Sequence, residues 1–202
     1  MRYLSLAALT LLASATATLA VDPRYPDWPC NQIKVPELSA AAVWAGPPID
    51  DVGDAWQNDP TIRDLVAQVA ARRTSLDEAE KAITDYFASA SADKQAKAKL
   101  LFAGIFTTLN RERTVVMDGI ERFARLQKQS AERIRAEVSE MRALQDAPNH
   151  DEAKVGDLGN KINWETQVFQ DKRKTIGYVC EVPTIIEQRL GALARAIQQA
   201  AE

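Results

Sequence analysis

The segment LNRERTVVMDGIERFAR, from Leu109 to Arg125, holds the densest mixture of acidic and basic side chains in the chain. As an α-helix, it would arrange these charges along about four turns. A catalytic interpretation would make Glu112 or Glu121 a buried acid with a raised pKa. The simpler interpretation is a set of surface ion pairs, such as Glu121 with Arg125 four residues later. We favour surface pairs, because they are common and each contributes little to stability.

Arg113 differs from its charged neighbours because it stands in a series of apolar residues at helical spacing. Three roles are open to a long basic side chain in such a position. It can extend its charged end to solvent, pair with Glu181 or Glu187 of a facing helix, or contact a ligand. Arg113 is therefore a candidate ligand-binding residue.

Other motifs that carry chemistry are absent from the sequence. The only histidine is His150, in an expected turn, and no Glu-x-x-His motif of a carboxylate-bridged di-iron bundle occurs. There is no Cys-x-x-Cys-His haem attachment motif, no Gly-x-Ser-x-Gly motif, no Walker loop and no dinucleotide fingerprint. We therefore expect a non-enzymatic protein, with no catalytic residue, no metal ligand and no cofactor.

Residues 1–20, MRYLSLAALTLLASATATLA, have the pattern of a secretory signal peptide. Arg2 provides the positive end, residues 4–12 provide a short apolar run, and small residues follow. Cleavage is expected after Ala20, with Ala17 as the alternative. The alanine-rich signal favours a bacterial periplasm as the destination, as does the lack of an N-glycosylation sequon.

Export makes the two cysteines informative. In an oxidising compartment, we expect Cys30 and Cys180 to form a disulfide. The alternatives are two unrelated thiols, or a disulfide-linked dimer through one of them.

The charge and the apolar runs of the sequence argue against a nucleic-acid partner and against a later transmembrane segment. A net charge of −3 gives no strong basic field, so we expect no nucleic-acid partner. The most apolar stretch after residue 20 runs from Leu100 to Phe106, with Lys99 and Arg111 close on either side. It is too short to cross a bilayer, and we expect no transmembrane segment after the signal peptide.

Residues 21–58, which we call the strap, are rich in proline and tryptophan. Seven of the nine prolines lie between Pro23 and Pro60, and each biases the chain away from a regular helix. We expect an extended strap docked on the other helices, with a short helix from Asp50 to Trp56. Its tryptophans would cover apolar surface. An alternative is a small-molecule pocket where the strap meets the long helices, with these candidate ligand-binding residues: Trp28, Trp44, Trp56 and Arg113.

Residues 59–202 form the expected helical bundle. Asp59 followed by Pro60 predicts a helix start, and Ser75 with Glu78 forms a capping-box pattern. These signals predict short helices over residues 60–73 and 75–89.

Two long apolar series with a heptad rhythm flank the turn DAPNHD. They predict an antiparallel helical hairpin with its tip near Pro148, in which Ile134 faces Ile162 and Ile120 faces Ile176. We expect Pro183 to kink the second long helix. The fold class is therefore all-α, with a long coiled-coil-like hairpin packed against two or three short N-terminal helices and the strap.

The short helices can cover only the base of so long a hairpin. Over about residues 125–172, the tip half, apolar residues would stay uncovered, with Trp164, Val168 and Phe169 as candidate partner-binding residues. We interpret the chain as an exported accessory or protein-interaction protein that binds another protein, or a second copy of itself, through the hairpin tip. The alternative for the tip is low local stability without a partner.

Overall fold

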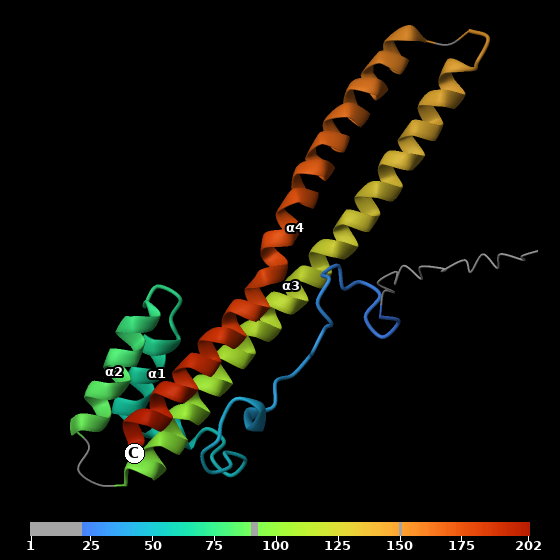
Figure 1. Ribbon diagram of the computed structural model, residues 1–202. Coiled ribbons are helices and arrows are strands. Elements are labelled where there is room, and N and C mark those ends of the chain that lie inside the picture. Colours follow the sequence, from blue (N-terminus) through green and yellow to red (C-terminus); the bar gives the residue numbers. More distant parts are fainter. Residues whose placement is uncertain (1–21, 90–92, 150) are drawn as a thin grey trace, which may run out of the picture.

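The structure is a computed structural model that describes residues 22–89, 93–149 and 151–202 (Figure 1). The expected all-α class is confirmed, since these ranges contain helices and no strand. In chain order, the elements are two short 3-10 helices, η1 (Ala40–Ala42) and η2 (Ala55–Asn58), and four α-helices, α1 (Pro60–Ala70), α2 (Leu76–Ser89), α3 (Lys94–Gln145) and α4 (Glu152–Ala201).

Helices α3 and α4 form the long antiparallel hairpin, and Figure 1 shows them running together from the base, near the C-terminus, to the tip. The side chain of Asp151 caps α4 by accepting hydrogen bonds from the backbone N–H groups of Ala153 and Lys154. Helix α4 continues through Pro183, where we expected a kink.

Helices α1 and α2 pack against the base of the hairpin (Figure 1). The caps predicted for their starts are present: Asp59 accepts from the N–H groups of Thr61 and Ile62, and the Ser75 N–H donates to Glu78. Helix α1 ends at Ala70, three residues earlier than expected, because the backbone turns extended at the next residue. The largest fully buried side chains of this base core are Ile62, Ile83, Phe87, Leu101, Phe102, Ile105, Leu109, Leu190, Leu193 and Ile197.

The strap runs antiparallel to α3. Asp27 contacts Lys128 toward the middle of the hairpin, whereas Asp51 contacts Lys99 near the base. Between these ends the strap forms only η1 and η2, so the helix expected from Asp50 to Trp56 is instead one short 3-10 turn that begins at Ala55. The strap is therefore a cover along one side of α3, as expected.

Burial along the hairpin is uneven. At the base, Leu109 and Leu190 are 1% and 0% exposed. In the tip half, most apolar residues of the interhelical seam are only half-buried: Ile134, Val138, Met141, Leu144, Val155, Leu158, Val168 and Phe169. Ile162 is buried, and the adjacent Lys161 forms an ion pair with Glu137 of α3. The strap and the short helices thus leave the tip half uncovered.

Candidate functional site

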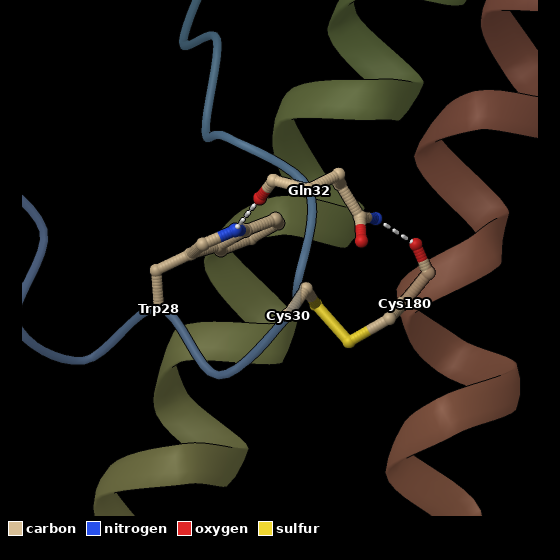
Figure 2. Close-up of a disulfide and its surroundings, with 4 residues drawn as sticks. All are labelled: Trp28, Cys30, Gln32 and Cys180. Carbon is tan, nitrogen blue, oxygen red and sulfur yellow. Dashed lines mark hydrogen bonds between the residues drawn. A yellow bond between two sulfur atoms is a disulfide. The ribbon is translucent and has the colours of Figure 1, made fainter. Parts of the chain in front are cut away.

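The strap is bonded to both long helices through residues 27–34, which we call the strap crossing (Figure 1). Cys30 forms the expected disulfide with Cys180 of α4, across 150 residues of sequence and with the two Cα atoms 5.6 Å apart. Figure 2 shows the hydrogen bonds around it: the Trp28 indole donates to the Gln32 carbonyl at 2.7 Å, and the Gln32 side chain donates to the Cys180 carbonyl.

Ion pairs fix the other side of the crossing to α3. Lys34 Nζ lies 2.6 Å from Glu121, and both side chains are largely buried. Asp27 lies 2.7 Å from Lys128 and 3.5 Å from Arg125. The hydrogen bond from Lys128 holds the pKa of Asp27 below its usual range. The predicted Glu121–Arg125 ion pair is therefore wrong, because each of these residues pairs with a residue of the strap instead.

Arg113 is buried beneath the strap, with 3% of its side chain exposed. Its Nε donates to Glu187 of α4 at 2.6 Å, and its Nη1 donates to the Pro36 carbonyl at 3.3 Å. Of the three roles open to it, pairing with Glu187 is the one observed. One guanidinium group thus ties together α3, α4 and the strap.

The tryptophans proposed to shape a pocket lie in separate places. Trp44 stacks on Phe102 in the base core, with ring centroids 4.4 Å apart. Trp56 packs on α3 at Gly104, where a Cβ atom would come within 2.8 Å of the indole. Trp28 lies at the strap crossing, well away along α3. Two of the three therefore act as base core residues, and Trp28 helps to shape the crossing.

A groove of about 400 Å³ opens between α3 and α4 beside the crossing, and we call it the interhelical groove. Its lining is mostly apolar, with charged side chains among the residues around it: Pro29, Phe123, Ala124, Gln127, Lys128, Ala131, Glu132, Arg135, Phe169, Arg173 and Ile176. Among these, sequence reasoning named only Phe169 as a candidate binding residue. A signal was present in Ala124 and Ala131, two small residues seven apart on one face of the helix.

The three candidate partner-binding residues share part of α4 but differ in exposure. Trp164 is 67% exposed, whereas Val168 and Phe169 are half-buried. Phe169 lines the interhelical groove, and its carbonyl accepts a hydrogen bond from Gln127 across the groove at 3.3 Å. Trp164 and Val168 are not among the groove residues. The structure therefore divides the proposed anchors between two surfaces.

The crossing and the groove present different kinds of side chain. Asp27 and Lys34 of the crossing are paired with charged side chains of α3, and the groove combines aliphatic, aromatic and basic side chains. Among the described residues, no cluster of histidine, cysteine or acidic side chains could hold a metal ion. His150 and the signal segment 1–20 lie outside the described residues.

No helix in the described part of the chain is both long enough and apolar enough to cross a membrane. No protein-family model matches the chain, and neither does any curated protein or solved structure.

Proposed function

We propose that the chain is an exported, non-enzymatic helical protein that binds another protein through the tip half of its hairpin. The observation that carries the proposal is the contrast in burial between base and tip. Seam residues such as Leu109 are fully buried, whereas Met141 and Val168 are half-buried and Trp164 projects into solvent. Aromatic side chains in exposed apolar surroundings are the usual anchors of protein interfaces.

The disulfide supports the export half of the proposal. A cross-link between residues 150 apart persists in an oxidising compartment and is rare in the cytosol. It agrees with the signal-peptide pattern of residues 1–20. A bacterial periplasm combines both features.

The hairpin geometry favours a protein over a small ligand at the tip. Beyond the interhelical groove, the uncovered seam extends from Ile134 past Met141 and back along α4 to Val168, so its residues form a long stripe rather than a closed cavity. Burial of such a stripe by a partner's helix resembles helix-in-groove recognition. A stable complex would need on the order of 1,200 Å² or more of buried surface.

Site-directed crosslinking in the exporting cell tests this proposal. A crosslinking residue at position 160, on the exposed side of α4, should capture a defined partner or a second copy in the wild type. The Trp164→Ala, Val168→Ala double variant should lose that product. Tyr178→Ala is the matched control, because Tyr178 is also a highly exposed aromatic residue of α4 and lies outside the tip half.

The double variant spares every residue that lines the interhelical groove. If it gave the same crosslinked products as the wild type and the control, docking at the tip would be refuted.

A further inference from the structure

We propose that the interhelical groove binds a single-chain amphiphile with an anionic head group, of the fatty-acid type. This inference is independent of protein docking at the tip, since the groove and the Trp164–Val168 surface are built from different side chains. The groove volume of about 400 Å³ lies within the range of small-molecule sites. Along α3 it extends from Phe123 to Arg135, about 18 Å at the rise of an α-helix, which suits an extended alkyl chain.

The walls provide the apolar part of the site. Phe123 from α3 and Phe169 and Ile176 from α4 stand around two small residues, Ala124 and Ala131. The alanines leave the space that larger seam residues would fill. Pro29, next to the disulfide-bonded Cys30, contributes a further apolar wall. An alkyl chain in this groove would be removed from water on several sides, which is the main source of its affinity.

The charges around the groove favour an anion. Three basic residues, Lys128, Arg135 and Arg173, surround it, against one acidic residue, Glu132. Lys128 already binds Asp27 and the Pro26 carbonyl. Arg135 and Arg173 make no hydrogen bond or ion pair with any described residue, so both guanidinium groups are available. A guanidinium group pairs with a carboxylate through two parallel hydrogen bonds, which a cationic head group cannot use.

The width of the hairpin favours a thin chain over a third helix lying between α3 and α4. The two helices are joined toward the tip by Arg133–Glu165 at 3.0 Å and by Glu137–Lys161 at 2.7 Å. Toward the base they are held by the strap and its disulfide. A helix inserted between them would need an axis-to-axis distance of about 8–10 Å to each, which would break these bridges. An alkyl chain can enter while they stay in place.

Calorimetry on the mature, disulfide-bonded protein provides the test. Tetradecanoate and tetradecyltrimethylammonium carry alkyl chains of equal length with opposite charges, and both are titrated as monomers. We expect one tetradecanoate per chain and affinity for the cation lower by about tenfold or more. Arg135→Gln with Arg173→Gln should weaken tetradecanoate binding by about tenfold, since each exposed charge pair contributes modestly. Arg122→Gln with Arg142→Gln, two exposed arginines of α3 outside the groove, should leave it unchanged.

A second pair of variants tests the apolar part. Ala131→Phe fills the groove and should abolish binding, whereas Ala136→Phe, at an exposed position of the same helix, should not. Circular dichroism checks that each variant keeps its helices.

Three outcomes would overturn the proposal. They are equal affinity for the anion and the cation, unchanged binding in Ala131→Phe, and binding to phosphatidylglycerol vesicles but not to monomeric tetradecanoate. An acidic helical peptide that bound while tetradecanoate did not would also refute it. The Trp164→Ala, Val168→Ala variant should bind tetradecanoate normally, which separates this site from docking at the tip.

Discussion

Arg113 and Glu187 occupy unequal environments, although they form one ion pair. The Arg113 side chain is 3% exposed, while 37% of the Glu187 side chain still meets solvent. Loss of the carboxylate would leave a cation buried with only the Pro36 carbonyl as a partner. Loss of the guanidinium would leave a carboxylate that water can reach. Removal of the carboxylate should therefore destabilise the fold more than removal of the guanidinium group.

This asymmetry gives a prediction. Glu187→Ala should lower the free energy of unfolding by about 2 kcal/mol, less than for a fully buried pair because the acid is partly solvated. Arg113→Met, which keeps a side chain of similar length and removes the buried charge, should cost about 1 kcal/mol. Urea denaturation of both variants measures the difference. A larger loss for Arg113→Met than for Glu187→Ala would contradict this account.

Two glycines of α3 should respond oppositely to the same substitution. A Cβ atom at Gly104 would come 2.7 Å from Val66 and 2.8 Å from Trp56, so Gly104→Ala should cost about 1–3 kcal/mol through overpacking. At Gly119 the nearest atom would be 3.7 Å away, on the flexible Arg122 side chain. Gly119→Ala should stabilise the helix by about 0.5–1 kcal/mol. The melting temperature should fall for Gly104→Ala and rise for Gly119→Ala. A change in the same direction for both variants would show that close packing does not decide the effect.

At the scale of elements, the outer end of the strap depends on an ionised carboxylate. The hydrogen bond from Lys128 lowers the pKa of Asp27, so the folded state favours the ionised form more than the unfolded state does. Above the pKa of Asp27 in the unfolded chain, about 3.9, the ionised carboxylate stabilises the folded state. This stabilisation is lost as the pH falls through the lower pKa of Asp27 in the folded protein. Acid should therefore release residues 22–28 before it affects the strap beyond Cys30, which the disulfide retains.

Hydrogen exchange at pH 3 and pH 6 tests this expectation. Exchange of residues 24–28 should rise relative to residues 40–44 at the lower pH, after correction for intrinsic rates. Asp27→Asn at pH 6 should reproduce the effect without acid. Equal protection of these residues in the wild type and Asp27→Asn would show that the carboxylate does not hold the strap.

Local signals explain why the helices could be predicted. Asp59 before Pro60 and the Ser75–Glu78 box act within one helical turn, and both are formed. Such local signals do not predict the contacts of the strap, because these contacts depend on where an irregular segment packs against α3. For that reason the partner of Glu121 was missed: Lys34 is 87 residues away in sequence. The interhelical groove likewise depends on how far α3 and α4 stand apart, which no single residue specifies.

At the scale of the whole molecule, the disulfide links the strap to α4 across most of the described chain. In the loop-entropy model, closing a loop of 150 residues stabilises the folded state by up to about 5 kcal/mol. Reduction of the wild type should therefore lower the urea midpoint strongly. Cys30→Ser with Cys180→Ser should show the same lower midpoint with or without reductant. A reduced wild type that kept its oxidised midpoint would rule out a stabilising role for the cross-link.

The strap also imposes an order of events in time. Cys30 leaves the ribosome 150 residues before Cys180, which takes roughly 8 to 30 s at usual rates of synthesis. During that interval the strap has no surface to dock on, because α3 and α4 are made after it. Until Cys180 is made, Cys30 remains a thiol. The helices against which the tryptophans of the strap later pack are not yet complete. A chain interrupted before Cys180 would therefore keep an unpaired thiol at Cys30, next to aromatic side chains that have no helix to pack against.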